Sequence, residues 1–402
     1  MNDYLVFLLF FLAVAIGWLL GRRGSRQVAS APDLPGQYYK GLNYLLDGRP
    51  DGAIDAFINA LEVNSETLET HIALGNLLRK KGEVDRAIRI HQNLLARPSL
   101  PRTQVHQAHL ELARDYISAG LLDRAERLLL DLVEESPLQR HASQRHLLDI
   151  YQSEREWQQA IEVATELLPR KSLLGGATPA ASEEPGQPVA VILPHYYCEL
   201  AAEKHQAGDL QGARQMLQEA LVQDKQCVRA SIMLGEVECD AARHKQAVKA
   251  LRKVRQQDPA YVCETIPILR RCYTELKDDK SLRAYIKECL DTQPSAPLVI
   301  AAAQYVLESE GSEVAEEFLA EQLAKRPSLR GLEQLIALQV GSSEGKTRDS
   351  LGLLQLLVKR LIEERPAYRC SHCGFSGRHL HWFCPGCKYW GTMKTIRGTS
   401  ME

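Results

Sequence analysis

Four cysteines near the carboxyl end of the chain have the types and the spacing of a metal centre. They form two C-x-x-C pairs, Cys370 with Cys373 and Cys384 with Cys387, and ten residues separate the pairs. Four thiolates can satisfy one tetrahedral zinc or iron ion. Gly374 allows a tight turn after the first pair, in which backbone N–H groups point at the sulfurs. We predict one bound ion, iron or zinc, with these four cysteines as its ligands.

The segment that must position these ligands is short, about thirty residues over 366–398. A chain of that length is too small to be stabilised by apolar burial alone. A structural zinc site contributes an apparent binding free energy of roughly 10–16 kcal/mol, so the ion and the fold should form together. Two disulfides or free thiols are the alternative. The aromatic residues of the segment should pack this module against the last repeats; they are Phe375, Trp382, Phe383, Tyr389 and Trp390.

The sequence contains no motif of a catalytic site. A Walker phosphate loop, a G-x-G-x-x-G turn after a strand, a G-x-S-x-G elbow and an H-E-x-x-H pair are all absent from it. His372, His379 and His381 lie near the cysteines, but a site with four thiolates is closed and leaves no open position for catalysis. We expect these histidines to pack or to hydrogen-bond, and we expect that the protein is not an enzyme.

Composition favours helices and excludes a bulk basic surface. Of the 402 residues, 45% are apolar and only 6% are aromatic, and the formal net charge of -2 provides no general attraction to nucleic acid. Six further cysteines lie in helical patterns without a paired spacing, which predicts small buried core residues in a reducing compartment. They are Cys198, Cys227, Cys239, Cys263, Cys272 and Cys289.

Small and large apolar residues recur along most of the chain with a period near 34, which is typical of tetratricopeptide helix pairs. Ala87, for example, follows Ala53 by 34 residues. Small residues at these positions let the two helices of a pair approach closely. We predict an all-α tetratricopeptide solenoid with units 1–4 at 37–168 and units 5–9 at 195–365. An irregular insertion rich in proline and glycine separates them at 169–194.

The concave face of such a solenoid commonly binds a peptide or a folded partner, and the first helix of each pair lines it. A solvated helix surface is the simpler interpretation of polar residues at these places. The polar candidates for contact with a partner are Tyr38, Asn43, Asn76, Arg79, Arg114 and Asp115.

The first residues of the chain have the pattern of a single membrane anchor. Residues 4–20 contain no charge and would span about 25 Å as a helix, close to the thickness of a bilayer core. Three arginines follow this segment, which places the amino terminus outside and the body in the cytoplasm. A cleaved signal peptide would instead carry its positive charges before the apolar stretch. We predict an anchor at 1–21 and a flexible tether at 22–36.

The order of anchor, helical repeats and paired cysteines resembles the lipopolysaccharide assembly protein B family of Gram-negative bacteria over the whole chain. The terminal stretches YRCSHCGF and FCPGCKYW also resemble rubredoxin, with the four cysteines at the ligand positions and Gly374 and Phe375 after the first pair. The chain departs from rubredoxin in a shorter spacer between the pairs and in Lys388, where a glycine is usual. This departure favours a structural ion over electron transfer.

The family resemblance implies a non-enzymatic, single-pass regulator of lipopolysaccharide biosynthesis in the cell inner membrane. It implies an adaptor that promotes degradation of UDP-3-O-acyl-N-acetylglucosamine deacetylase by a membrane AAA+ metalloprotease, and contact with the lipopolysaccharide transport proteins. An anchor suits this role because it confines the adaptor to the plane of the protease and raises its effective concentration. The alternatives are an iron-dependent rubredoxin-like redox protein, a generic tetratricopeptide assembly scaffold, and a zinc ribbon that binds nucleic acid.

Overall fold

The computed structural model describes residues 68–96, 100–168, 186–292 and 294–396. It also describes eight single positions: Trp18, Lys40, Gly41, Asn43, Tyr44, Asp47, Gly52 and Ala56. Apart from these positions, the predicted anchor, the tether and the first helix pair lie outside the described residues, as does the start of the predicted insertion. Within the described part of the chain, no helix is long and apolar enough to cross a membrane. The chain divides into two compact units between Ser143 and Gln144.

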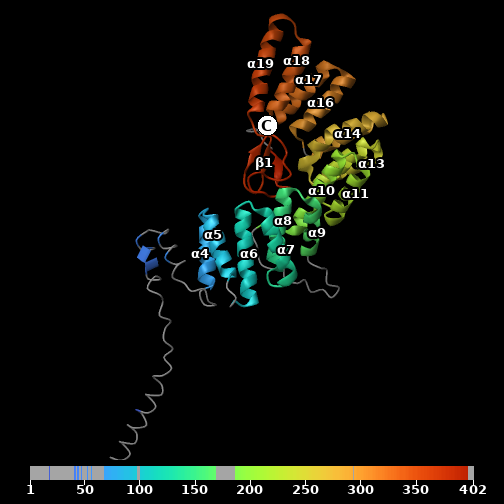
Figure 1. Ribbon diagram of the computed structural model, residues 1–402. Coiled ribbons are helices and arrows are strands. Elements are labelled where there is room, and N and C mark those ends of the chain that lie inside the picture. The colour runs from blue at the N-terminus through green and yellow to red at the C-terminus, as the bar shows by residue number, and fades with distance from the viewer. Residues whose placement is uncertain are drawn as a thin grey trace, which may run out of the picture. The chain divides into compact units, whose positions relative to one another are not determined.

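The first unit is built from helix pairs (Figure 1). Helix α4 (Leu68–Lys80) packs against α5 (Val84–Leu95), and α6 (Arg102–Ser118) packs against α7 (Leu122–Glu135). Contacts between α5 and α6 join the two pairs. Helix α8 (Arg140–Glu154) begins in this unit and continues into the second.

The second unit repeats this arrangement up to the carboxyl-terminal module (Figure 1). Its elements are α9 (Trp157–Leu167), α10 (Val189–Gln206), α11 (Leu210–Gln223), α12 (Val228–Asp240), α13 (His244–Gln257), η1 (Pro259–Tyr261), α14 (Val262–Leu276), α15 (Asp279–Thr292), α16 (Ala296–Glu310), α17 (Ser312–Lys325), α18 (Leu329–Ser342) and α19 (Gly345–Glu363). From α10 onward, each helix with an even label packs against the odd-labelled helix that follows it. The tetratricopeptide solenoid predicted from the 34-residue period is confirmed for the described helices.

Small residues permit the close approach of paired helices. Ala87 on α5 is completely buried. A Cβ added at Gly75 would lie 2.4 Å from Nε2 of His91, and a Cβ added at Gly235 would lie 2.4 Å from the Leu251 side chain. Any larger residue at these two glycines would force the helices apart, so the repeated small residues of the sequence set the distance between them.

Each described pair has one residue with positive φ where the chain reverses between its helices; seven of the eight follow the end of the first helix, and Gly345 begins the second helix of its pair. These residues are Gly82, Gly120, Arg155, Gly208, Ala242, Lys277, Gly311 and Gly345. Glycine adopts this conformation freely. Arg155, Ala242 and Lys277 adopt it with a side chain attached, which costs about 1–2 kcal/mol each.

Helix α10 begins inside the segment 169–194, which the sequence predicted to be irregular throughout. The helix starts at Val189 and includes Pro194, so the predicted boundary is wrong at its carboxyl end. Proline at this position removes one intrahelical hydrogen bond. Leu193 and Tyr196, which flank it, are almost completely buried, and the apolar surface that they remove from water offsets the lost bond.

The carboxyl-terminal module contains a small antiparallel sheet with the strand order β2-β1-β3. The strands are β1 (Tyr368–Cys370), β2 (Ser376–Gly377) and β3 (Met393–Thr395). The buried cluster of the module consists of Cys370, Cys384 and Met393. Two of its three members are predicted metal ligands, so the metal centre takes the place of an apolar core, as expected for so short a segment.

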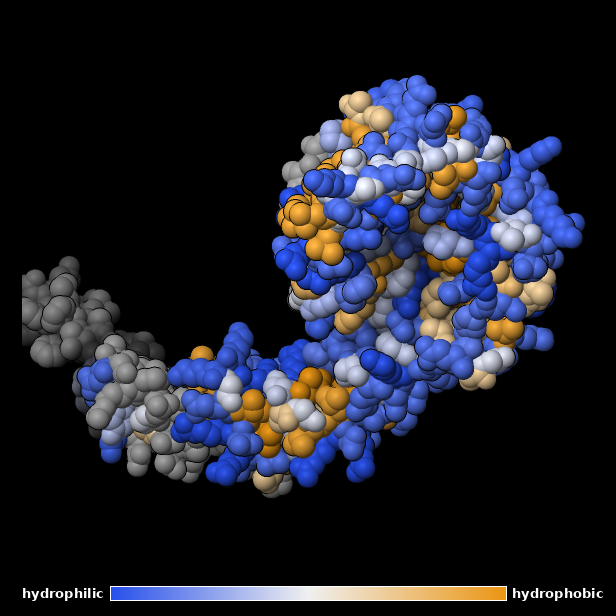
Figure 2. All heavy atoms as spheres, turned by 90° about the horizontal axis from the view of Figure 1, so that it is seen from above, coloured by the Kyte–Doolittle hydropathy of each residue, from blue (hydrophilic) through white to orange (hydrophobic). Residues whose placement is uncertain are grey.

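The surface is largely hydrophilic, and Figure 2 shows hydrophobic residues gathered in separate patches on one face. The last helix of the array, α19, carries five leucines that are 45–62% exposed: Leu353, Leu354, Leu356, Leu357 and Leu361. Within the described residues, no further helix pair follows α19 to cover them. The exposed leucines of α19 therefore depart from the polar outer face that is usual for the terminal repeat of an array.

Candidate metal centre and the surface that holds it

The two C-x-x-C pairs fold into matching turns. In the first turn the N–H of Gly374 donates to the carbonyl of Cys370 at 3.1 Å, and in the second the N–H of Lys388 donates to the carbonyl of Cys384 at 2.9 Å. Gly374 has φ of +78° and Lys388 has φ of +61°. The second turn therefore keeps the shape of the first although a lysine replaces the glycine, at a cost of about 1–2 kcal/mol.

These turns bring the four predicted ligands together. The sulfurs of Cys370 and Cys387 lie 3.7 Å apart, and those of Cys373 and Cys384 also lie 3.7 Å apart. All four sulfurs lie within 4.8 Å of one another. Sulfurs that share one tetrahedral zinc at a bond length of about 2.3 Å lie roughly 3.8 Å apart. The donor set therefore fits one tetrahedral zinc or iron ion, as the spacing of the cysteines predicted.

Hydrogen bonds prepare the sulfur of Cys370 for a metal ion. Burial raises the pKa of this thiol, but the Thr392 hydroxyl and the backbone N–H groups of Cys373 and His372 bring the pKa down to about 6. The hydroxyl oxygen lies 3.2 Å from the sulfur, and the two backbone nitrogens lie 3.5 and 3.4 Å from it. The thiolate is the form that binds a metal ion, so the surroundings of Cys370 favour that form at this one sulfur, whereas burial raises the pKa of Cys387 to about 12.

The metal centre is buried on one side and accessible on the other. Cys370 and Cys384 are 2% and 0% exposed, whereas Cys373 is exposed. The His372 ring stacks on Tyr389 with the ring centroids 4.1 Å apart, so this histidine packs beside the site, as predicted. Four sulfurs complete the coordination of a tetrahedral ion and leave no place on it for a substrate.

Trp390 fastens the module to the array within the second unit. Its indole Nε1–H donates to Oε1 of Gln152 at 2.9 Å, and its backbone N–H and carbonyl both bond to the side chain of Gln187. The His195 ring stacks on the indole with the centroids 5.1 Å apart. Trp390 is only 3% exposed. The array contacts described above, together with the module, bury this large side chain.

A second aromatic contact lies beside the first. Trp382 stacks on Tyr261 of η1 with the ring centroids 5.3 Å apart, and the Tyr261 hydroxyl donates to the backbone carbonyl of Met393 at 2.6 Å. The guanidinium carbon of Arg229 lies 6.0 Å from the Trp382 ring centroid and 5.5 Å from that of Trp390. A buried cation between two indole rings gains cation–π attraction, so Arg229 links both tryptophans to α12.

The docking site differs from the one that the sequence predicted. The aromatic residues of the module were expected to pack against the last repeats, but Trp382 and Trp390 contact the middle repeats, so that expectation is wrong. The chain reverses after α19 and carries the module back along the array, where polar contacts such as Tyr368 with Glu264 add to the docking. Only contacts between residues far apart in the chain determine this position.

Burial fixes the charge state of His195 at this interface. Removal from water, and then the positive charge of Arg229, lower the pKa of His195 to about 3. A neutral ring can stack flat on Trp390, with an angle of 17° between the planes. The two tryptophans therefore pack against a cation, Arg229, and Trp390 also stacks on a histidine that stays neutral near physiological pH.

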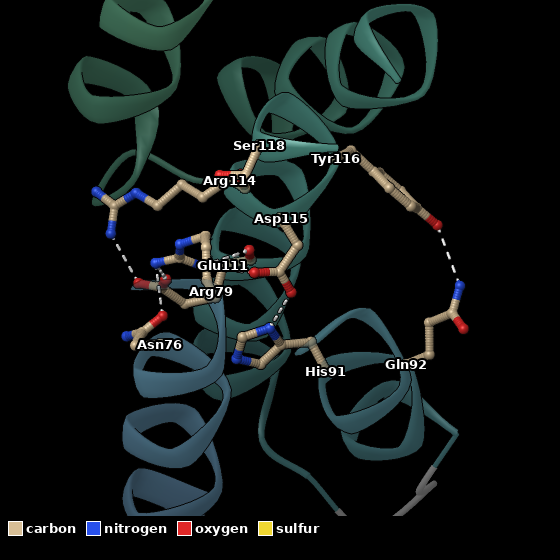
Figure 3. A network of polar contacts seen from close by, with 9 residues as sticks. All are labelled: Asn76, Arg79, His91, Gln92, Glu111, Arg114, Asp115, Tyr116 and Ser118. Atoms are coloured by element: carbon tan, nitrogen blue, oxygen red, sulfur yellow. Dashed lines mark hydrogen bonds and ion pairs between the residues drawn. The ribbon is translucent and has the colours of Figure 1, made fainter. Parts of the chain in front are cut away.

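Four of the predicted groove residues instead form a polar network in the first unit; they are Asn76, Arg79, Arg114 and Asp115 (Figure 3). The Arg79 guanidinium contacts Asp115 at 2.7 Å and Glu111 at 2.8 Å. His91 bonds to the other oxygen of Asp115, and both side chains are completely buried. Asp115 therefore holds α4, α5 and α6 together and cannot reach a partner.

One signal for this network is present in the sequence. His91 occupies a position where the repeat pattern otherwise places an apolar residue, which points to a buried polar partner. Glu111, the remaining member, is indistinguishable in sequence from a solvated helix residue. Of the two other groove candidates, Asn43 is exposed and Tyr38 lies outside the described residues.

A cavity of about 240 Å³ lies beside the module, where strands β1 and β3 meet η1, α14, α16, α18 and α19. Its walls carry charges of both signs, from Glu264, Arg330 and Arg365. The remaining wall is largely apolar and includes Pro259, Ala260, Pro297, Leu329 and Ile362. A cavity that combines apolar side chains with a few charged groups can accept a peptide segment or a small ligand.

Comparisons with known proteins place the fold and the module in established families. Residues 368–395 match the rubredoxin metal binding domain, and residues 70–103 and 204–262 match tetratricopeptide repeats. Lipopolysaccharide assembly protein B of Escherichia coli strain K12 is 36% identical over 397 residues, which cover 98% of each chain. The chain belongs to the lipopolysaccharide assembly protein B family.

A second member of this family is more distant but equally complete. Lipopolysaccharide assembly protein B of Haemophilus influenzae is 33% identical over 403 residues, again covering 98% of each chain. Because both alignments run through the helical array and the metal module, the likeness to the lipopolysaccharide assembly protein B family extends over both parts.

Proposed function

We propose that this chain is a non-enzymatic adaptor in lipopolysaccharide assembly, anchored in the cell inner membrane by residues 1–21 with its body on the cytoplasmic side. The observation that carries the proposal is the likeness to lipopolysaccharide assembly protein B over 98% of the chain. The docked module supports it, because Cys370, Cys373, Cys384 and Cys387 form a donor set that would complete the coordination of one iron or zinc ion and leave no position for a substrate.

The adaptor acts by bringing two partners together. It promotes the degradation of UDP-3-O-acyl-N-acetylglucosamine deacetylase by a membrane AAA+ metalloprotease, and it contacts the lipopolysaccharide transport proteins. An anchor confines the adaptor to the plane of the protease, so a weakly bound client is delivered at high local concentration. The cavity with Glu264, Arg330 and Arg365 is a candidate for the place where a client segment binds.

Depletion of the protein in cells tests the proposal directly. The half-life of the deacetylase should lengthen severalfold, and expression of the wild-type chain should restore it. Trp390→Ala, which detaches the module from Gln152 and His195, should fail to restore it. Val222→Ala is the matched control, since Val222 is 69% exposed and should restore the normal half-life. An unchanged half-life after depletion contradicts the adaptor role.

The anchor can be tested separately from the client. Replacement of residues 1–21 by an unrelated single-pass segment with the same orientation should preserve activity, because the anchor supplies only location. Deletion of the same residues should abolish activity while the body still folds. Full activity of the deleted form would show that the adaptor does not need its membrane anchor.

A redox protein is the second candidate, and the exposure of Cys373 favours it. An accessible ligand sulfur offers a path for an electron between the ion and a partner. Protein purified from iron-sufficient cells should then be coloured and should lose and regain its visible absorption on reduction and reoxidation. Stoichiometric zinc without colour in such preparations removes this candidate.

A further inference from the structure

A second group of metal-binding side chains lies in the array, outside the module. The sulfurs of Cys239 and Cys272 and a ring nitrogen of His244 all lie within 4.8 Å of one another. The Cys239 sulfur lies 4.0 Å from Nδ1 of His244. A sulfur and an imidazole nitrogen on the same tetrahedral zinc lie roughly 3.6 Å apart, given bonds of about 2.3 and 2.0 Å. The three donors are therefore close to the spacing that an ion requires.

Two of these donors are held by one rigid turn between α12 and α13. The N–H of Ala242 donates to the carbonyl of Cys239 at 3.0 Å, and the N–H of Arg243 donates to the carbonyl of Glu238 at 2.8 Å. His244 is the first residue of α13, so the turn returns its side chain to the end of α12. A metal site gains affinity when its ligands are fixed before the ion arrives, and this turn provides that.

Cys272, the third donor, is held close to Cys239 by an ion pair between the residues next to these two cysteines. Arg271 on α14 contacts Asp240 on α12 at 2.8 Å, and Cys272 and Cys239 are their respective chain neighbours. His205 on α10 also bonds to Asp240, at 3.0 Å. Asp240 is thus fixed from two sides, and α12 and α14 are clamped next to the two sulfurs.

The surroundings are apolar on one side and open on the other. Cys239 and Cys272 are 5% and 0% exposed and form a core cluster with Ala247. His244 is partly exposed, so an ion could enter beside it and a water molecule could complete its coordination. Two thiolates and an imidazole are a donor set that prefers thiophilic ions over magnesium or calcium.

We propose that Cys239, His244 and Cys272 form a second metal site, which binds zinc(II) through two sulfurs, one imidazole nitrogen and a water molecule. Binding displaces the two thiol protons to the solvent. The bound ion connects α12, α13 and α14 at the edge of the array. This proposal is independent of the adaptor role, because it concerns metal binding by the purified chain alone.

The metal content of the purified full-length chain tests the proposal. After incubation with zinc and removal of free metal, the wild type should retain about two ions per chain, one in each site. His244→Ala and Cys272→Ala should each retain about one, a twofold loss. Because His244 is partly exposed at the start of a helix, its variant should fold even if Cys272→Ala does not.

Cys227→Ala is the matched control. Cys227 and Cys198 are also neighbouring buried thiols in the array. Within the described residues, no histidine or carboxylate lies close enough to form a three-donor group with them. This variant should keep about two ions. A wild type that retains only one ion, with His244→Ala unchanged, overturns the proposal.

Hydrogen exchange is a second measurement, and it distinguishes a bound ion from a disulfide. Zinc should slow exchange of the backbone N–H groups in the turn between α12 and α13 in the reduced wild type, and it should leave His244→Ala unaffected. If protection in the wild type instead requires oxidation and is insensitive to zinc, Cys239 and Cys272 form a disulfide and the metal proposal fails.

Discussion

The two units hold their helices and strands together by different means. In the first unit, Asp115 joins neighbouring helices through buried bonds to Arg79 and His91, which lie no more than 36 residues away in the chain. In the second unit, Trp390 joins the module to Gln152 across 238 residues. The first arrangement is local and needs only ordinary side chains, whereas the second depends on a folded module and therefore on its metal ion.

One repeat architecture can therefore be stabilised by local contacts in one part and by distant contacts in another. Local charged networks let the helices of a repeat array lock as each pair forms. Because the carboxyl-terminal module docks on the middle repeats, the stability of these repeats depends on the folding of the module.

Metal removal should have the largest effect and should be confined to the second unit. Stripping the four-cysteine site with a chelator under reducing conditions removes on the order of 10 kcal/mol of binding free energy that stabilises the module. Hydrogen exchange should then rise in the module and in α9, α10 and α12, while α4 to α6 keep their protection. Added zinc should reverse the change. An equal loss of hydrogen-exchange protection in both units would show that they unfold as one cooperative unit.

Asp115→Ala should produce the opposite pattern. It leaves the completely buried His91 without its partner and removes one of the two carboxylates that bind Arg79, which should destabilise the first unit by about 3–5 kcal/mol, as measured by chemical denaturation. The metal content of the module should stay at the wild-type value. Asp123→Ala, at an exposed position of α7, is the control and should change stability by less than about 0.5 kcal/mol.

Acid should weaken the second unit through His195. The folded pKa of about 3 lies below the value near 6.5 of an unfolded histidine, so the unfolded chain binds more protons between these values. The contribution of His195 is complete above about pH 6.5 and is lost as the pH falls toward 3. Thermal unfolding across this range should show a steeper loss for the wild type than for His195→Gln. Identical slopes would mean that the ring is already charged at the interface.

Tyr261→Phe should have the smallest effect, because it removes one hydrogen bond and keeps the ring that stacks on Trp382. The loss of stability in the second unit should be about 1–2 kcal/mol, since the carbonyl of Met393 is left buried without its donor. Denaturation followed by tryptophan fluorescence measures it. A loss as large as that of metal removal would show that this bond, not the ion, holds the module in place.

Local features of this protein were predictable from the sequence, and distant ones were not. The cysteine ligands follow from spacing within the segment from Cys370 to Cys387, and the repeats follow from a 34-residue period. The docking of Trp390 depends on partners about 200 residues away, which no short pattern encodes. The role of Asp115 could not be predicted, because a buried acid and a solvated one look alike in the sequence until the neighbouring helices are placed.

The return of the module to the middle repeats closes a loop in the chain between Gln152 and Trp390. An open solenoid frays from its end, one pair after another. Here a force applied to the carboxyl terminus reaches the contacts of β3 with η1 and then those of Trp390 before it reaches α19, so α19 is shielded until these contacts open. A protease that pulls its substrates from the carboxyl end would therefore find this chain resistant for as long as the ion stays bound.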